Sequence, residues 1–204
     1  MRAAKLAGAA NALKSKSGGG GEKAPFSLAF MTDRARVADP ALVARALPEG
    51  AAVILRDYDT PNRAALAAQL AQICAARGVM LLVGADPDLA RLVGAKGLHM
   101  PSWFLKRNED AANSLSGMIV SAACHCEREL RAAASLNADI ALLSPAFPTA
   151  SHPDADALGP ARLRRLAATA PLPVLALGGV NETNAALLTG PNVAGLAAIS
   201  AFVD

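Results

Sequence analysis

Residues Ala141 to Gly159 read ALLSPAFPTASHPDADALG, and this stretch decides how the rest of the chain is interpreted. The apolar run from Ile140 to Leu143 is bounded by turn residues, which is typical of a strand covered on both faces. The residues after it are too polar and too often interrupted by proline to belong to a core. We therefore predict a buried strand that leads into a binding loop, with a plain surface excursion as the alternative. The loop holds hydrogen-bonding side chains of the kind a ligand needs, namely Ser144, Thr149, Ser151 and His152.

A second strand, closed by a glycine pair, lies at Pro171 to Val180, PLPVLALGGV. Gly178 and Gly179 end its apolar run, and Asn181 is placed to cap a helix over residues 182–188. Paired glycines let the backbone approach an anion closely, and the first N–H groups of a helix have no partner within it. Because strand–helix barrels commonly hold a phosphate near their last strands, this stretch predicts a phosphate site.

The same alternation of strand and helix runs along most of the chain. Eight strands that alternate with helices in one domain predict an α/β fold, a TIM (β/α)8 barrel, with a doubly wound open sheet as the alternative. The sequence ends at Asp204, so we expect the last helix to be short or missing. The expected strands are Ser27–Met31, Ala51–Leu55, Val79–Val83, Gly97–Met100, Met118–Ala123, Ile140–Leu143, Val174–Leu177 and Leu196–Ile199.

Residues 1–24 stand apart from this alternation. An Ala-rich, helix-like segment leads into Ser17–Gly21, whose composition is that of a flexible linker. We therefore expect a flexible Ala/Gly-rich tail over residues 1–24 and a barrel over residues 25–204. The tail is either mobile or an extra helix on the barrel. As an extra helix, the tail would take the place of the missing last helix, although its glycines argue against a fixed position.

The composition excludes several classes of function. The chain is 53% hydrophobic and 3% aromatic, which is ample for a core of Ala, Leu and Val, and its formal net charge of +3 is modest. No helix face combines basic and aromatic residues, so we predict no binding to nucleic acid. No apolar run is long enough to cross a bilayer, so we predict no membrane segment.

The cysteines do not indicate a disulfide framework, because there are three of them and Cys74 lies far from Cys124 and Cys126. Free thiols indicate a reducing compartment, and we expect a cytoplasmic protein. Cys124-His125-Cys126 offers two kinds of zinc ligand, but the further ligands that zinc needs are missing at workable spacing. We therefore predict no metal site.

Several short motifs together resemble one family, and the resemblance runs from about Phe26 to Phe202. The chain is similar to the thiamine phosphate synthase/TenI family of small barrels, and the part from Ser144 to Gly159 looks especially like the TenI-type domains found behind some Nudix domains. The matching residues are Thr32-Asp33-Arg34, Leu98-His99, Cys124-His125, Leu143-Ser144-Pro145, Pro148-Thr149, His152-Pro153, Leu158-Gly159, Gly178-Gly179 and Ile199-Ser200-Ala201.

His125 is the best candidate for proton transfer, because it stands between a strand and a helix and an imidazole titrates near the working pH. The alternative is that it caps the following helix. In TenI-like proteins that tautomerise thiazole phosphate carboxylate, a histidine at the matching position is the acid/base residue. The candidate substrate- and phosphate-binding residues are Arg34, Arg56, Ser144, Thr149, Ser151, His152, Gly178, Gly179 and Ser200.

Some of these assignments have a second interpretation. Arg34 and Arg56 are either ligands or members of salt bridges on the barrel rim. His152 stands where the synthase has a lysine for the diphosphate, and it is either a weaker phosphate partner or a surface residue. His99 follows a buried strand, which favours a structural histidine whose hydrogen bonds are satisfied.

Three departures from the family pattern affect the expected reaction. Arg56 keeps the arginine of the synthase's Gln-x-Arg-x-Lys motif, but Tyr58 replaces the lysine. Gly84 and Ala85 replace an Asn-Asp pair that supports magnesium, and Phe104 replaces the second magnesium carboxylate. Metal ions and fixed cations are the main means of stabilising a leaving diphosphate. We therefore expect no cofactor, with magnesium possible only if the chain is a synthase.

The resemblance implies a barrel of thiamine biosynthesis that binds thiazole phosphate and tautomerises its carboxylate through His125. One alternative is a divergent thiamine phosphate synthase that joins hydroxymethylpyrimidine diphosphate to thiazole phosphate. The others are a catalytically silent barrel that binds such a ligand for regulation, and a phosphate-binding isomerase outside thiamine chemistry. The expected partner is a small phosphorylated substrate, and a homo-oligomer is left open.

Overall fold

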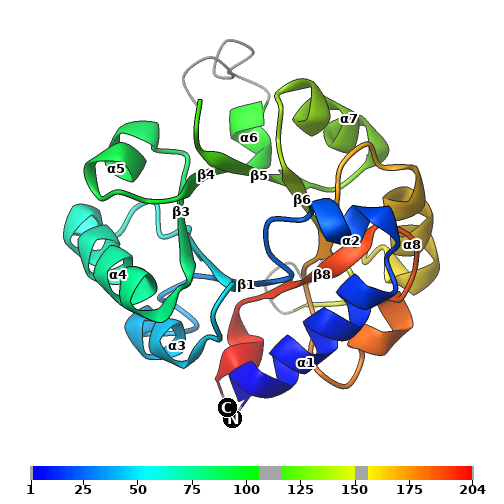
Figure 1. Cartoon of the computed structure of the whole chain (residues 1–204), viewed down its shortest axis with the longest axis horizontal. Helices are drawn as coiled ribbons and strands as arrows, with labels where there is room; N and C mark the ends of the chain where they lie inside the picture. Colours follow the sequence, from blue (N-terminus) through cyan, green and yellow to red (C-terminus); the bar gives the residue numbers. More distant parts are fainter. Residues whose placement is uncertain (1, 106–115, 150–155, 204) are drawn as a thin grey trace.

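Eight parallel strands close into a barrel in the computed structural model, which describes residues 2–105, 116–149 and 156–203 (Figure 1). Each strand pairs with its neighbours in chain order, and Leu28 of the first strand lies beside Leu196 of the last to complete the ring. The predicted TIM (β/α)8 barrel is therefore confirmed. The strands are β1 (Leu28–Met31), β2 (Ala52–Leu55), β3 (Met80–Gly84), β4 (Gly97–Met100), β5 (Ile119–Cys124), β6 (Ile140–Leu143), β7 (Val174–Ala176) and β8 (Val193–Ala198).

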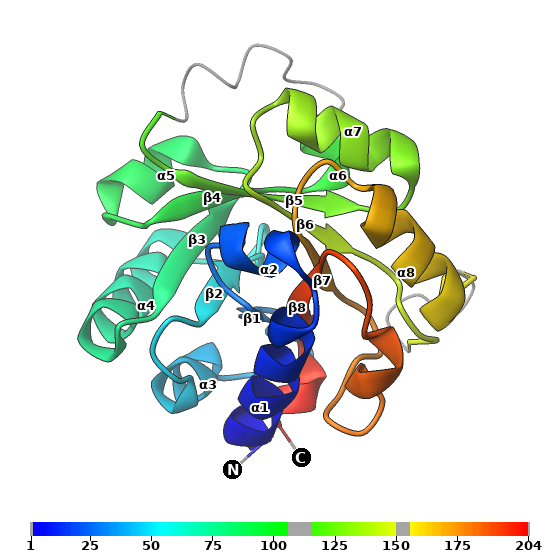
Figure 2. The same cartoon turned by 45° about the vertical axis from the view of Figure 1, so that its right-hand side comes forward.

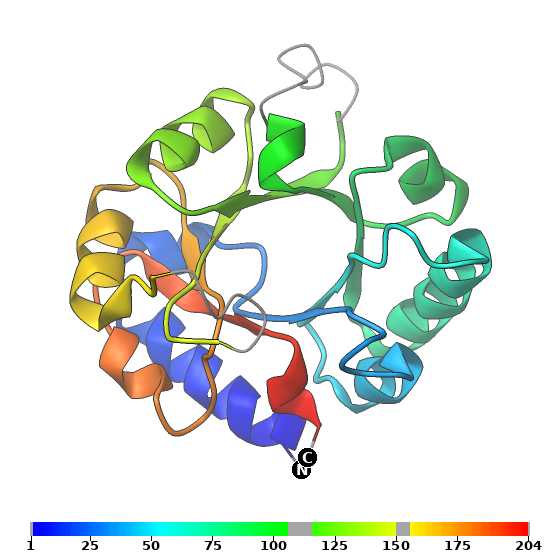
Figure 3. The same ribbon diagram turned by 180° about the vertical axis from the view of Figure 1, so that it is seen from behind.

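Helices form the outer layer around this ring, as Figures 1 and 3 show from opposite sides. Several begin with the signals that the sequence carries, such as Asp39, whose side chain accepts a hydrogen bond from the N–H of Ala41 at the start of α3. The helices are α1 (Arg2–Ser15), α2 (Gly19–Lys23), α3 (Pro40–Ala46), α4 (Arg63–Arg77), α5 (Pro87–Leu92), α6 (Ser102–Leu105), α7 (Glu127–Ser135) and α8 (Gly159–Thr169), with the 3-10 helices η2 (Ala185–Leu188) and η3 (Ser200–Phe202).

The interior of the ring is filled by apolar side chains. Met31 of β1, Ile54 of β2 and Leu82 of β3 belong to one buried cluster, and Met31 also reaches the pocket at the end of the barrel. Phe30 points the other way and meets the ring of Phe202 edge-on, with 5.3 Å between the ring centroids. Because successive strand residues face opposite sides, one face of each strand fills the interior and the other meets the helices. Polar site residues therefore concentrate at the strand ends.

Helix α1 covers β8, where no full helix follows in the sequence. Leu6, Ala10 and Leu13 lie on one side of α1 and are buried in the core that the outer strand faces share with the helices. Figure 2 shows α1 lying along the barrel beside β8, with both chain ends close together. For residues 1–24 we expected either a flexible tail or an extra helix on the barrel, and the structure has the helix.

Gly20 and Gly21 pack against neighbouring residues instead of forming a flexible connection. A Cβ at Gly20 would lie 1.9 Å from Oδ1 of Asn192, and a Cβ at Gly21 would lie 2.5 Å from the carbonyl oxygen of Lys14. The N–H of Asn192 also donates to the carbonyl of Ser17 at 2.8 Å. Only glycine allows this close approach of α2 to the start of β8, which corrects the interpretation of the segment as a linker.

Two elements near the end of the chain differ from the prediction. β8 begins at Val193 instead of Leu196, because Gly195 continues the strand where the backbone of β1 approaches too closely for a side chain. The helix expected over residues 182–188 is reduced to η2, although Asn181 Oδ1 accepts the N–H groups of Thr183 and Asn184, at 2.9 and 3.2 Å, as an N-cap does. Up to Val203, the last described residue, η3 is the element that follows β8, which agrees with the expected short or missing last helix.

Removing part of the α1 interface will destabilise the whole barrel. We expect Leu6→Ala to lower the free energy of unfolding by about 2–5 kcal/mol, because Leu6 is fully buried and its truncation leaves a cavity. The matched control is Leu42→Ala on α3, where the side chain is 63% exposed and the expected change is within about 0.5 kcal/mol. Urea unfolding followed by circular dichroism measures both. Equal stabilities of the two variants would mean that α1 is detached from the barrel in solution.

Candidate active site

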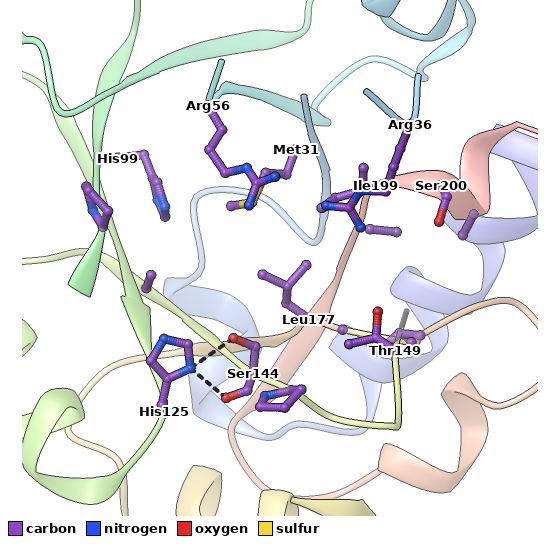
Figure 4. A pocket seen from close by; sticks show the side chains of 18 of the residues that line it. Met31, Arg36, Arg56, His99, His125, Ser144, Thr149, Leu177, Ile199 and Ser200 are labelled. Carbon is purple, nitrogen blue, oxygen red and sulfur yellow. Dashed lines mark hydrogen bonds between the residues drawn. The ribbon is translucent and has the colours of Figure 1, made fainter. Parts of the chain in front are cut away.

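A pocket of about 700 Å³ lies at the carboxyl ends of the strands. This is the end of a (β/α)8 barrel where active sites are built. In Figure 4 Arg56 and Met31 lie on one side of the cavity, and His125 and Ser144 lie on the other. The candidate residues that line the pocket are Arg56, His125, Ser144, Thr149, Gly178, Gly179 and Ser200.

Of the three remaining candidates, Arg34 is among the described residues and is not brought to the pocket. Ser151 and His152 lie outside the described residues. Arg34 is absent from the pocket wall, and its Nη1 donates to Oγ1 of Thr60 at 3.0 Å. The reason is local, because the backbone N–H of Arg34 donates to Asp57 at 2.8 Å and anchors the turn after β1 to the turn after β2. Arg34 is therefore held at the rim by hydrogen bonds, and among the described residues it has no salt bridge of the kind that the alternative interpretation expected.

The turn after β7 presents free backbone donors to the pocket. Gly178, Gly179 and Val180 all line it, and their N–H groups donate none of the hydrogen bonds between described residues. Gly178 and Gly179 have φ angles of 91° and 65°, in the left-handed region that glycine tolerates. Successive N–H groups in such a turn form a concave site for an anion. The helix expected after this turn is reduced to the short η2. The candidate donors for an anion are therefore the backbone N–H groups themselves, without help from a helix dipole.

The two glycines are also required by the loop that packs behind them. A Cβ at Gly178 would lie 3.0 Å from Cα of Pro145, and a Cβ at Gly179 would lie 2.7 Å from the carbonyl oxygen of Pro148. The N–H of Phe147 donates to the carbonyl of Gly178 at 3.0 Å, which fixes the loop after β6 against the turn. The loop and the turn therefore form one wall of the pocket.

His125 is held by the end of β6 and not by the helix that follows it. Its Nδ1 lies 2.9 Å from the carbonyl oxygen of Ser144 and 3.3 Å from Oγ of the same residue (Figure 4). A carbonyl only accepts, so Nδ1 carries the proton, and in the neutral ring Nε2 has the free lone pair. The start of α7 is capped instead by Glu129, whose carboxylate accepts the backbone N–H of His125 at 2.7 Å. The side chain is therefore not the helix cap.

Asp33 holds two arginines at the pocket wall, and one of them was missed in the sequence. Arg36 donates from Nε and Nη2 to Oδ2 of Asp33 at 2.9 and 2.6 Å, and Arg56 Nη2 donates to the same oxygen. Burial raises the pKa of Asp33, but the hydrogen bond and charge of Arg36 and the charge of Arg56 outweigh it and leave the pKa below its usual value. Asp33 therefore stays ionised and orients both guanidinium groups. The feature of the sequence that could have identified Arg36 is its position three residues after Asp33.

His99 lies at the pocket wall but is 1% exposed, and its Nδ1 is 2.9 Å from Oγ of Ser121. Burial, assisted by the charge of Arg56, lowers the pKa of His99 to about 3. The ring is therefore neutral at physiological pH and has the satisfied, structural character that the sequence favoured. Further lining residues without an assigned role in the sequence include Met31, Trp103, Pro145, Leu177 and Asn181.

The residues at the family's magnesium positions do not fit that ion. Gly84 has no side chain, and a Cβ there would lie 3.0 Å from Cε1 of Tyr58. Ala85 is apolar and Phe104 is 9% exposed, so none of the three offers an oxygen ligand from its side chain. Magnesium prefers carboxylate and water oxygens in octahedral geometry. Among the described residues, no group of three His, Cys, Asp or Glu side chains is placed to hold a metal.

The cysteines carry no chemistry at this site. All three are free, and burial raises the pKa of Cys74 and of Cys124 to about 12, with Glu129 and Cys126 adding to the shift of Cys124. Both thiols therefore stay protonated at neutral pH. Within the described ranges no helix is both long and apolar enough to cross a bilayer.

The fold and the pocket define a class of protein, a (β/α)8 barrel with a pocket at the carboxyl ends of its strands and a glycine turn after β7 in the wall of that pocket. Within that class the chain belongs to the thiamine monophosphate synthase family, whose model matches residues 28–202. The membership confirms the resemblance and places the chain in a family of thiamine biosynthesis.

The relatives carry related names. A putative thiamine-phosphate synthase of Geobacter sulfurreducens is 32% identical over 193 residues, which cover 89% of this chain and 88% of that protein. A thiamine biosynthesis bifunctional protein of Symbiobacterium thermophilum is 35% identical over 146 residues, 70% of this chain but only 30% of that longer protein. A solved thiamine phosphate pyrophosphorylase of Pyrococcus furiosus has a TM-score of 0.71 at 23% identity, with 88% of each chain covered, and supports the fold.

The glycine turn gives a direct test of the anion site. We expect Gly179→Ala to weaken the binding of thiazole phosphate at least tenfold, because a Cβ there meets Pro148 and displaces the donor amides. Isothermal titration calorimetry measures the affinity. Gly50→Ala is the matched control, since Gly50 also has a positive φ, of 77°, but a Cβ there meets nothing within 4 Å. If both variants bind like the unchanged protein, the phosphate does not bind at this turn.

Proposed function

We propose that the pocket binds a small phosphorylated thiazole, with its phosphate on the amides of Gly178, Gly179 and Val180. The single observation that carries the proposal is this run of three amides, which have no acceptor among the described residues and belong to residues that line the pocket. Backbone amides suit a phosphate because they donate without the flexibility of a long side chain. Ser200 lies at the same wall and adds a hydroxyl. Membership of a thiamine biosynthesis family supports the identity of the ring.

The reaction we propose is tautomerisation of thiazole phosphate carboxylate, with His125 as the acid/base residue. A tautomerisation takes a proton from one atom of the substrate and returns it to another, so it needs one group that both accepts and donates. Nε2 of His125 suits this role, since the carbonyl of Ser144 fixes the proton on Nδ1. The ring is solvent-accessible at the pocket wall, where a bound substrate can meet it.

The lack of fit to magnesium also supports a proton transfer. No leaving diphosphate forms in a tautomerisation, so the reaction does not require a metal clamp. The arginines that Asp33 orients, Arg36 and Arg56, supply positive charge for a carboxylate on the substrate. Phosphate, ring and carboxylate would then each meet a different wall of the pocket.

His125→Asn separates catalysis from binding. The asparagine Nδ2 keeps a donor for the carbonyl of Ser144 but removes the base at Nε2, so we expect turnover to fall by roughly 10²–10⁴-fold. Affinity for thiazole phosphate and the free energy of unfolding should change little. The assay follows the absorbance of the thiazole phosphate carboxylate across pH, with Cys126→Ser as a neighbouring control of near-unchanged activity. Full activity in His125→Asn would remove the histidine from the mechanism.

The second candidate function is that of a thiamine phosphate synthase, which the names of the relatives favour. In that reaction the hydroxymethylpyrimidine diphosphate loses its diphosphate as it joins thiazole phosphate. On the β1–β2 side of the pocket wall, the described positive side chains that could contact this diphosphate are Arg36 and Arg56, and both bind Asp33. Two guanidinium groups that share Asp33 offer less positive charge than a metal ion with a lysine.

A condensation assay distinguishes the two reactions. We expect little or no thiamine phosphate from the two precursors, and no more than a twofold change when magnesium is added or chelated, because Gly84, Ala85 and Phe104 provide no ligand. Product is measured by chromatography, with a magnesium-dependent synthase as the positive control. A rapid rate that depends on magnesium would make the synthase function correct. Binding of thiazole phosphate without either reaction would assign the chain as a ligand-binding barrel.

A further inference from the structure

Helix α1 brings a positive side chain to the pocket. Arg2, the first residue of α1, lines the same pocket as Gly178, Gly179 and Ser200. The residues that the family model matches begin at residue 28, so this arginine comes from a part of the chain that precedes the match. Arg2 is therefore an addition of the N-terminal helix to a pocket that the barrel builds.

Arg2 reaches the pocket because α1 occupies the place of the helix that would follow β8. In a (β/α)8 barrel each outer helix follows a strand and so begins on the side where that strand ends. The start of α1 likewise lies beside η3, the element that follows the carboxyl end of β8 (Figure 2). Such barrels frequently bind phosphate between the loops after the seventh and eighth strands and the start of a nearby helix. The replacement of the last helix by α1 thus puts residue 2 at that position.

Two kinds of contact hold Arg2 in place. Its Nη1 donates to the carbonyl of Val203 at 2.9 Å, and the N–H of Val203 donates to the carbonyl of Ser200 at 3.2 Å. The first turn of α1 is anchored from below, because Ala3 and Leu6 are buried in the core. A guanidinium has five N–H donors, so a bond through Nη1 can hold the group beside η3 while other N–H groups meet a ligand.

The charges of the pocket wall give Arg2 a distinct role. The arginines among the described lining residues are Arg2, Arg36 and Arg56. Arg36 and Arg56 share the carboxylate of Asp33, which offsets part of their charge. The glycine turn and Ser200 offer neutral donors, whereas a phosphate ester carries about 1.5–2 negative charges at neutral pH. A formal positive charge at the edge of these neutral donors therefore favours a phosphate over an uncharged group.

We propose that Arg2 binds the phosphate of the ligand together with the amides of Gly178, Gly179 and Val180, and makes the site selective for a doubly charged phosphate ester. The proposal rests on the proposed phosphate site and adds a charged side chain to it. Hydrogen bonds between a guanidinium and a phosphate are shorter and stronger than those between neutral groups. The backbone amides and the Ser200 hydroxyl recognise the shape of the phosphate, and Arg2 adds recognition of its charge.

Arg2→Ala tests this role in the full chain. We expect it to weaken thiazole phosphate roughly tenfold, the lower end of the range for a hydrogen bond to a charged group, because Arg2 is exposed. Lys5→Ala is the matched control, since it removes the same charge from an exposed position of the same helix that does not line the pocket, and its affinity should stay within about twofold. Arg2→Lys, which keeps the charge, should recover most of the lost affinity. Calorimetry measures these affinities.

The pH dependence separates a contact with the phosphate from a merely structural role. A phosphate ester loses its second proton near pH 6, whereas the guanidinium stays charged throughout. The weakening caused by Arg2→Ala should therefore be larger at about pH 7.5, where the ester is doubly charged, than at about pH 5, where it is singly charged. If Arg2 only supported the fold of α1, its removal would weaken the binding equally at both pH values.

The outcomes distinguish this proposal from the phosphate site on which it rests. An affinity of Arg2→Ala equal to that of Lys5→Ala, or a weakening that does not change with pH, would overturn the role of Arg2. If Gly179→Ala weakens thiazole phosphate while Arg2→Ala does not, the phosphate site stands and only the added arginine is wrong. If thiazole phosphate does not bind to the unchanged protein, the phosphate site and the role of Arg2 fail together.

Discussion

The close contact between the turn after β7 and the loop after β6 is the constraint on which the candidate site depends. Gly178 and Gly179 accept this contact because neither has a Cβ that would collide with Pro145 or Pro148. The hydrogen bond from the N–H of Phe147 to the carbonyl of Gly178 fixes the turn and leaves the N–H groups of Gly178 and Gly179 without an acceptor among the described residues. The same loop begins at Ser144, whose carbonyl orients the ring of His125. One packing contact thus positions both the anion donors and the candidate base.

The rest of the pocket is divided between a charged side and an apolar side. On the charged side Asp33 is shared by Arg36 and Arg56, and its lowered pKa keeps this carboxylate ionised between the two guanidinium groups. On the apolar side Tyr58 fills the space beside Gly84, and its ring packs edge-on against Trp103. The electrostatics therefore favour a ligand with separated anionic groups and flat uncharged parts over one with a concentrated diphosphate charge.

Much of the fold could be predicted because each strand carries its own signals. Apolar runs such as Ile140–Leu143 end in turn residues, and Asp39 marks the start of α3 by a local hydrogen bond. The placement of α1 was harder, because its glycines have a linker composition and show their packing role only against Asn192, far away in the sequence. At the site, His125 and the glycine pair were found from strand-end position. Arg36 and Trp103 were not assigned, since their roles depend on contacts with Asp33 and Tyr58 that only the closed barrel creates.

Binding and chemistry in this pocket rest on different parts of the chain. The proposed phosphate site uses backbone N–H groups, which no side-chain replacement elsewhere removes as long as the β6 loop stays packed against the turn. The candidate base is a side chain at another strand end, His125 after β5, and Tyr58 after β2 lines the same pocket. Gly84 and Tyr58 stand where the family pattern has a metal-binding and a cationic side chain. These differences therefore change the possible reaction without disturbing the proposed phosphate site on the backbone. This separation explains how a chain can keep the family's fold and glycine turn while the opposite wall of its pocket becomes aromatic.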